Sequence, residues 1–192
     1  MTVLTLNKNR RIIFTEQLPQ WVVNINLAVY QVMIINKHSL APSTTQILAA
    51  ATQLAAKYRR PSTGTEHVLM ALCTDPEFVA FIGDKIMFDQ ELIHADIEQY
   101  MQPDDGPLAG NALRLTPRLT QVLDITAEIT RELGSPSIEP EHLLLGILKE
   151  GNSVTAQVLN KNGIYFHPLV SCLDGSNDGS ERVEAAVGMN AR

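Results

Sequence analysis

Apolar residues recur with a helical spacing in two segments of the chain. In residues 47–58 they occupy positions i, i+1, i+4, i+7, i+8 and i+11, the stripe of an amphipathic helix (Ile47, Leu48, Ala51, Leu54, Ala55 and Tyr58). Residues 122–133 repeat the stripe, with threonines at two of the small apolar positions. A proline follows each segment, Pro61 or Pro136, and it pushes the preceding residue out of helical geometry. The pattern predicts two related helices that end near these prolines.

The likeness between the two segments extends beyond the helices. The offset from Glu66 to Glu141 is 75 residues, and it aligns residues 41–77 with 116–152 without a gap. Nine aligned positions hold identical residues, which in the first copy are Pro42, Thr45, Gln46, Leu48, Pro61, Ser62, Glu66, His67 and Leu69. An internal repeat of this kind is typical of a unit that needs its copy to bury its apolar face. We therefore expect two halves packed as one pseudo-twofold domain.

Each copy also predicts further helices after its proline. A short turn leads to Gly64 or Glu139 at the expected N-cap, with Thr65 or Pro140 at the first helical position. The Glu-His pair and a run of aliphatic residues follow. Third and fourth helices are expected at about 77–84 and 89–101 in the first copy, and at about 152–162 and 166–173 in the second.

The remaining segments divide the chain. Residues 1–40 form an N-terminal extension outside the repeat, in which alternating apolar residues at 23–29 predict a strand or hairpin. The repeat domain covers residues 41–173, with repeat 1 at 41–101, a Pro/Gly/Asp-rich linker at 102–115 and repeat 2 at 116–173. Residues 174–192 have too little apolar surface to order their backbone, which predicts a flexible tail.

Composition narrows the class of protein. The chain has 192 residues with 45% hydrophobic content, which is typical of a globular protein with a core. A net charge of −6 without a long basic run argues against nucleic acid as a partner. Cys73 and Cys172 lack a CxxC or disulfide spacing, and the apolar stretch at 21–35 is too short to span a membrane. We therefore expect a cytoplasmic protein with no membrane partner.

The second copy resembles a known family. The segment "LTPRLTQVLDITAEITRELGSPSIEPEHLLLGILKEGNSVTAQVLNKNGI", residues 115–164, is similar to the repeat of the Clp amino-terminal domain of the ClpA and ClpC unfoldases. "STGTEHVLMAL", residues 62–72, is similar to the corresponding block of that family. The resemblance covers about residues 41–173 and implies an all-α bundle of two four-helix repeats. It also implies a docking platform for adaptors and for unfolded or tagged substrates, with Clp ATPase or Clp protease subunits as partners.

The resemblance also implies binding residues. Glu66 and Glu141 match glutamates that help to bind the guanidinium group of phosphorylated arginine in some ClpC-like proteins. Thr116 matches a threonine that helps to hold the phosphate, whereas the first repeat has Ala41 at that position. Thr65 matches the family's usual residue before the glutamate. The second repeat departs from the pattern there, because it has Pro140.

The sequence lacks a GxxxxGK[ST] motif, so we expect no P-loop and no bound nucleotide or other cofactor. The chain is then a docking module that acts in trans, or a fragment of a longer unfoldase. Two further hypotheses are an accessory or scaffold subunit that stabilises a Clp protease complex, and a repurposed domain unrelated to proteolysis.

Local structure offers a second interpretation of the Glu-His pairs. An acidic residue in the first turn of a helix gains about 0.3–1 kcal/mol from the helix dipole, and a histidine at the third position can bond a nearby backbone group. We therefore expect a structural or a binding role for His67 and His142. Catalysis is a weak alternative for Glu66-His67 and Glu141-His142, because neighbouring helical residues point in different directions. The chain has no HExxH metal motif, and Cys73 lies among core leucines. We therefore expect a non-enzymatic protein without a metal site.

Overall fold

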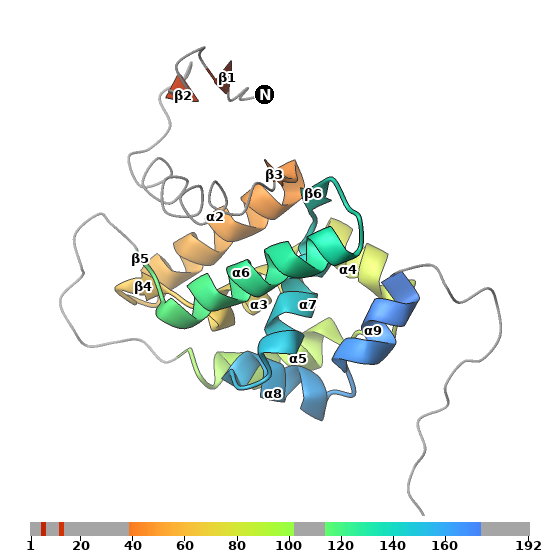
Figure 1. The fold of residues 1–192 in the computed structure, drawn as a ribbon. Helices are drawn as coiled ribbons and strands as arrows, with labels where there is room; N and C mark the ends of the chain where they lie inside the picture. The colour runs from red at the N-terminus through yellow and green to blue at the C-terminus, as the bar shows by residue number, and fades with distance from the viewer. Residues whose placement is uncertain (1–4, 7–11, 14–38, 102–113, 174–192) are drawn as a thin grey trace, which may run out of the picture.

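The structure, a computed structural model, describes residues 5–6, 12–13, 39–101 and 114–173. Its first repeat contains β3 (Ser39–Leu40), α2 (Pro42–Lys57), β4 (Ser62–Thr63), α3 (Thr65–Thr74), α4 (Pro76–Gly83) and α5 (Gln90–Glu98). Its second repeat contains β5 (Arg114–Leu115), α6 (Pro117–Glu132), β6 (Ser137–Ile138), α7 (Pro140–Glu150), α8 (Val154–Lys161) and α9 (Phe166–Leu173). The described residues thus form eight helices with a few short strands (Figure 1). The predicted all-α class with two four-helix repeats is confirmed.

Short strands connect the two repeats reciprocally. β3 pairs in parallel with β6, and β4 pairs in parallel with β5. β3 and β5 are counterparts at the 75-residue offset, and so are β4 and β6. The first strand of each repeat therefore pairs with the strand that precedes the second helix of the other repeat. This exchange is the pseudo-twofold arrangement that the internal repeat predicted.

The strands correct two details of the sequence analysis. Residues 39–40 fell in the predicted extension and residues 114–115 in the predicted linker, yet each is a paired strand of the fold. The segments at 62–63 and 137–138 were expected as turns, but they are strands because they pair with residues 114–115 and 39–40. A two-residue strand is too short to leave a period-2 pattern, and its partner lies in the other repeat.

The N-terminal extension contains an antiparallel pair of strands, β1 (Thr5–Leu6) and β2 (Ile12–Ile13). The strand predicted at 23–29 lies outside the described residues, as do residues 102–113 of the predicted linker and the predicted tail at 174–192.

The core is centred on the second helix of each repeat. Residues 67–73 of α3 and 142–148 of α7 are all buried, and each of these helices packs against the first helix of its own repeat and against helices of the other. The long helices α2 and α6 cover this pair (Figure 1). Continuous burial along α3 and α7 explains why their aliphatic runs lack a polar face.

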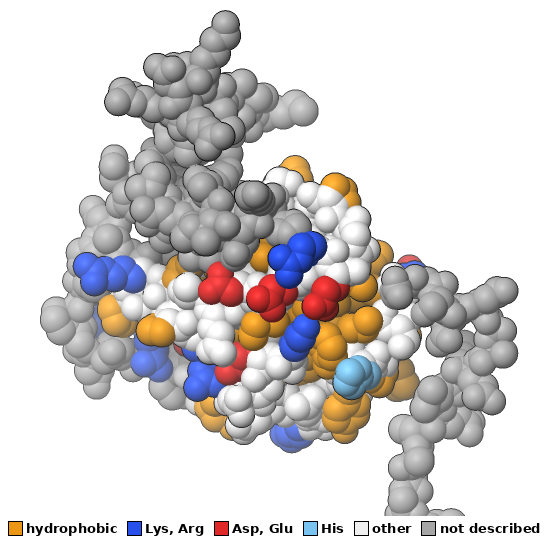
Figure 2. All heavy atoms as spheres, viewed as in Figure 1, with side chains coloured by type: hydrophobic (Ala, Val, Ile, Leu, Met, Phe, Trp, Pro, Cys, Tyr) orange, Lys and Arg blue, Asp and Glu red, His pale blue; other side chains and the backbone are white. Residues whose placement is uncertain are grey.

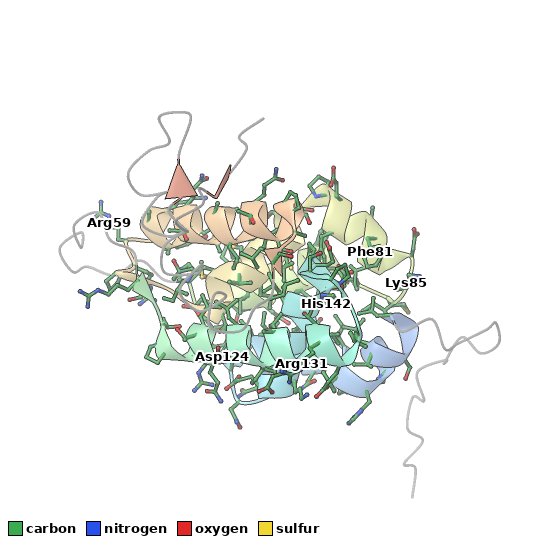
Figure 3. The ribbon with its side chains drawn as sticks, turned by 45° about the horizontal axis from the view of Figure 1, so that its top comes forward. Arg59, Phe81, Lys85, Asp124, Arg131 and His142 are labelled. Atoms are coloured by element: carbon green, nitrogen blue, oxygen red, sulfur yellow. The ribbon has the colours of Figure 1, made fainter. Side chains whose placement is uncertain are left out.

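The outer face of α6 is more charged than that of α2. Asp124, Glu128 and Glu132 lie four residues apart along α6, and acidic side chains gather on this side of the molecule (Figure 2). Their counterparts in α2 are Ala49, Gln53 and Lys57, so this acidic row is absent from the first repeat. Asp124 and Arg131 lie on this face in Figure 3, whereas His142 lies inside the helical body.

Candidate functional site

Both histidines of the Glu-His pairs cap their own helices. The Nδ1 atom of His67 accepts a hydrogen bond from the backbone N–H of Gly64 at 3.0 Å, and Nδ1 of His142 accepts one from Glu139 at the same distance. Gly64 and Glu139 are the N-caps of α3 and α7, as the sequence predicted. The histidines are 1% and 6% exposed. They therefore have a structural role at each helix start, and a binding role for them stays a prediction.

The capping bonds also fix the charge of the two rings. Burial lowers the pKa of His67 and of His142 below the ordinary 6.5, although nearby glutamates act in the opposite direction. A ring whose Nδ1 accepts a hydrogen bond must be unprotonated at that atom. Both rings are therefore neutral imidazoles in the folded protein at neutral pH.

The geometry of Glu66 and His67 gives no support to a catalytic pair. Oε1 of Glu66 lies 3.4 Å from Nδ1 of His67. This is closer than the sequence argument expected, but the lone pair of Nδ1 already accepts the Gly64 N–H, so two acceptors face each other. The proton of the ring is on Nε2, which is buried and has no hydrogen-bond partner among the described residues. The pair thus lacks the shared proton that acid–base catalysis requires.

Cys73 is also unsuited to nucleophilic chemistry. Burial raises the pKa of its thiol to about 12, which keeps it protonated at neutral pH. The histidine that shares a shallow pocket with it is His94 of α5 rather than His67. In the described part of the chain, no cluster of three or more His, Cys, Asp or Glu side chains could hold a metal ion.

The strand exchange determines which predicted residues share a site. β4 and β5 run in parallel, so α3 and α6 both begin at the same edge of the strand pair. The backbone N–H of Thr116 donates to the carbonyl of Thr63 at 2.9 Å. Thr116 of repeat 2 is thereby placed beside the segment that leads into Thr65 and Glu66 of repeat 1. We call these three residues the Thr116 site.

The same argument assembles a second group at the other strand pair. The N–H of Ala41 donates to the carbonyl of Ile138 at 3.0 Å, and α2 and α7 begin side by side. Ala41 is thus placed beside the segment that leads into Pro140 and Glu141, and we call these three residues the Ala41 site. Both departures from the family pattern fall in this one site, although they lie in different repeats.

Charge and hydrogen bonding differ between the two sites. At the Thr116 site the N-cap of α3 is Gly64, and Glu66 is 34% exposed. At the Ala41 site the corresponding N-cap is Glu139, whose carboxylate accepts a hydrogen bond from the hydroxyl of Ser137 at 2.7 Å. Burial, together with the charge of Glu139, raises the pKa of Glu141. The Ala41 site therefore has a second acidic residue, Glu139, beside it, and its surroundings disfavour ionisation of the predicted binding glutamate.

Thr116 has a local role as well. It is the N-cap of α6, and its Oγ1 accepts a hydrogen bond from the N–H of Leu119 at 3.1 Å. Its hydroxyl proton is not used by this bond and remains available as a donor. Ala41 is the N-cap of α2 and has no side-chain cap. The loss of a hydroxyl at position 41 thus affects both the helix end and the site.

Sequence reasoning missed two charged residues near α6. Arg118 in the first turn of α6 forms an ion pair with Glu150 at the end of α7, with Nη1 and Oε1 3.0 Å apart. The residues are separated by 32 positions, so no helical or strand periodicity connects them. The only signal in the sequence is their opposite charge within the two segments that match the family.

Residues 39–162 match the family described as the Clp repeat (R) N-terminal domain, which is more than half of the chain. The chain belongs to this family. The domain of this family is a non-catalytic module that interacts with adaptors and substrates.

Full-length relatives are much longer than this chain. It is 30% identical over 150 residues to "Negative regulator of genetic competence ClpC/MecB" of Bacillus subtilis, covering 76% of this chain and 18% of that protein. It is 28% identical over 137 residues to "Chaperone protein ClpB" of Oceanobacillus iheyensis, covering 69% of this chain and 17% of that protein. The chain thus spans less than a fifth of these relatives.

The fold also matches a solved structure. The Hsp104 N-terminal domain from Candida albicans aligns with a TM-score of 0.57 at 15% identity, over 73% of this chain and 94% of that domain. This similarity supports the fold alone. Among the described residues, no helix is long and apolar enough to cross a membrane.

Proposed function

We propose that this chain is a non-enzymatic interaction module that binds substrates or adaptors for a Clp-type AAA+ unfoldase or its protease. The observation that carries the proposal is the parallel pairing of β4 with β5, which gathers Thr116, Thr65 and Glu66 at one edge. These are the residues through which the family resemblance implies binding. They lie in different repeats, so only the folded domain assembles them.

The chemistry of the Thr116 site suits a ligand with an anionic and a cationic part. Two helix N-termini supply free backbone N–H groups and positive dipole ends, which favour a phosphate. The hydroxyl of Thr116 adds a donor, and the carboxylate of Glu66 favours a guanidinium group. A phosphorylated arginine side chain has both features, and we propose it as the preferred ligand of this site.

The Ala41 site is the weaker of the two in this proposal. Pro140 removes one backbone N–H from the start of α7, and Ala41 lacks the hydroxyl donor. The carboxylate of Glu139 would repel a phosphate. We therefore expect one principal binding site per domain, even though both glutamates of the repeat motif are present.

The test is binding of a fluorescein-labelled phosphoarginine peptide by fluorescence anisotropy, with the unphosphorylated peptide as reference. Glu66→Ala should weaken binding about tenfold or more, as expected for a lost charge-assisted hydrogen bond, while Glu141→Ala should change it less than about twofold. Circular dichroism should be unchanged for both variants. Equal binding of both peptides, or equal losses in the two variants, would contradict the proposal.

The role of the module in a larger assembly needs a separate experiment. Affinity purification of the intact chain from its native cytosol should recover Clp ATPase subunits if it delivers substrates or adaptors. Recovery of Clp protease subunits without the ATPase would support an accessory or scaffold role instead. Recovery of neither would favour a domain repurposed outside proteolysis.

A further inference from the structure

Glu150 stands at a locally unfavourable position. It is the last residue of α7, where the carbonyl groups of a helix carry partial negative charge and disfavour an anion. Its side chain is nevertheless only 4% exposed. Neither the helix dipole nor contact with water explains a carboxylate at this point, so its tertiary contacts must explain it.

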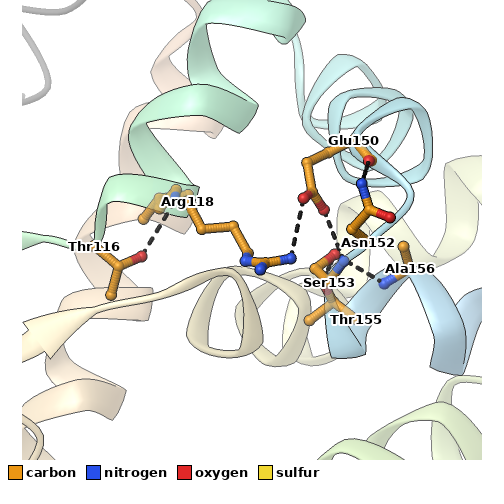
Figure 4. A network of polar contacts seen from close by, with 8 residues as sticks. Thr116, Arg118, Glu150, Asn152, Ser153, Thr155 and Ala156 are labelled. Atoms are coloured by element: carbon orange, nitrogen blue, oxygen red, sulfur yellow. Dashed lines mark hydrogen bonds and ion pairs between the residues drawn. The ribbon is translucent and has the colours of Figure 1, made fainter.

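Each oxygen of Glu150 binds a different element. Oε1 lies 3.0 Å from Nη1 of Arg118 in α6, and Oε2 accepts a hydrogen bond of 2.8 Å from the N–H of Ser153. Ser153 in turn caps α8, because its Oγ accepts from the N–H of Ala156 at 3.2 Å (Figure 4). A single buried carboxylate thus joins the start of α6 to the turn between α7 and α8.

The same connection reaches the Thr116 site. Arg118 is two residues from Thr116, in the same first turn of α6 (Figure 4). Thr116 is held on its other side by its hydrogen bond to the carbonyl of Thr63. A shift of this turn would therefore move the Thr116 hydroxyl relative to Glu66.

The first repeat lacks this connection. The counterparts of Arg118 and Glu150 at the 75-residue offset are Ser43 and Asp75. Asp75 accepts a hydrogen bond from the N–H of Phe78 at 2.7 Å and caps α4, but a serine at position 43 has no charge to pair with it. The start of α2 is held instead by Thr44, whose Oγ1 donates to the carbonyl of Ile138 at 2.7 Å.

We propose that Arg118 and Glu150 are positioning residues for the Thr116 site, and we call the pair the Arg118–Glu150 clamp. The clamp holds the first turn of α6 against the turn between α7 and α8, while the Thr116 N–H holds the same turn to β4, so that the Thr116 hydroxyl faces the ligand in one fixed orientation. Its significance for binding rests on the proposed function. Its effect on the α6 turn does not, and the two are measured separately.

The first measurement needs no ligand. Glu150→Gln keeps the size of the side chain but removes its charge, and Asp75→Asn is the matched control at the corresponding corner of repeat 1. Amide hydrogen exchange should become about tenfold faster at Thr116 and Leu119 in Glu150→Gln, because local opening of the α6 turn becomes easier. Asp75→Asn should leave these two amides unchanged.

The second measurement asks whether the clamp acts through Thr116. In the anisotropy assay, Glu150→Gln should lower the affinity for the phosphoarginine peptide about fivefold in the wild-type background and have no further effect in a Thr116→Ala background, because coupled residues are not additive. Arg118→Met should reproduce both results, and Arg118→Lys should restore part of the affinity. A purely structural role would give additive losses instead.

The outcomes separate the two proposals. Unchanged exchange at Thr116 and Leu119 in both Glu150→Gln and Arg118→Met overturns the clamp, and so does a uniform rise in exchange across α3 and α7, which would indicate general destabilisation. If the wild-type chain does not bind the peptide, the proposed function fails while the exchange data still decide the clamp. If Glu150→Gln does not fold, Arg118→Met supplies the same test.

Discussion

The two repeats pack their first helix against their second with different residues at matching positions. In repeat 1, Ala51 of α2 and Ala71 of α3 are both buried. Their counterparts in repeat 2 are Thr126 of α6 and Gly146 of α7, and a Cβ placed on Gly146 would overlap the hydroxyl of Thr126. The larger residue on one helix is accommodated by the smaller residue on the other. A larger side chain on one helix is thus matched by a missing side chain on the other, as close packing of two helices requires.

The largest expected effect comes from filling the space that Gly146 leaves for Thr126. Gly146→Ala should destabilise the fold by about 2–3 kcal/mol, because the new methyl group meets Thr126 and lies 3.0 Å from the carbonyl oxygen of Val122. Urea unfolding followed by circular dichroism measures this loss. The double variant Thr126→Ala/Gly146→Ala recreates the alanine pair of repeat 1 and should recover most of the stability. No recovery in the double variant would mean that the two helix pairs do not share one spacing.

The difference between the two candidate sites should largely disappear when the Ala41 site is given the residue types of the Thr116 site. Ala41→Thr combined with Pro140→Thr gives the Ala41 site the residue types of the Thr116 site, and adding Glu139→Gly removes the extra charge. Titration calorimetry with the phosphoarginine peptide should then show a second binding event within about tenfold of the first, since the restored hydrogen bonds are worth about 1.5 kcal/mol. The unmodified chain should show one event. Two events in the unmodified chain would remove the asymmetry that we propose.

A smaller effect is expected at the ends of α2 and α6. Arg59 has a φ of 55° and its counterpart Gly134 has a φ of 67°, so both occupy the left-handed region after the helix. This conformation costs a residue with a Cβ about 1 kcal/mol relative to glycine. Gly134→Arg should therefore lower the free energy of unfolding by about 1 kcal/mol, and Arg59→Gly should raise it by a similar or smaller amount. Thermal unfolding of the two single variants provides the measurement, and shifts of the same sign would be inconsistent with this account.

The smallest effect concerns pH and the two capping histidines. Burial lowers the pKa of both rings, so below the ordinary value of 6.5 the unfolded chain binds more protons than the folded one. The stability contributed by the neutral caps is thus fully present above pH 6.5 and is lost as the pH falls toward the folded pKa. Urea midpoints between pH 7.5 and 5.5 should decrease, and the decrease should be smaller in His142→Gln. An identical slope in His142→Gln would show that its ring does not contribute.

The local features of the fold were predictable from the sequence. The helical stripes, which end before Pro61 and Pro136, and the N-caps at Gly64 and Glu139 lie where they were expected. Such features depend on backbone geometry and on neighbours within about four residues, so they can be predicted from one sequence. The repeat itself also follows from the sequence, because both copies must bury the same face.

The composition of the candidate site depended on the tertiary structure. Sequence reasoning matched Thr116, Ala41 and the two glutamates to family positions without grouping them, whereas the strand exchange brings the Thr116 segment beside that of Glu66 and the Ala41 segment beside that of Glu141. The Arg118–Glu150 ion pair could not be predicted from the sequence either, because its partners are 32 residues apart. Contacts of this kind form only when two distant segments pack together, and neither the period nor the capping pattern of one segment contains that information. The sequence alone determined two related bundles. The packing of one bundle on the other determined which residues share a site, so that the β4–β5 pair and the β3–β6 pair carry different candidate sites.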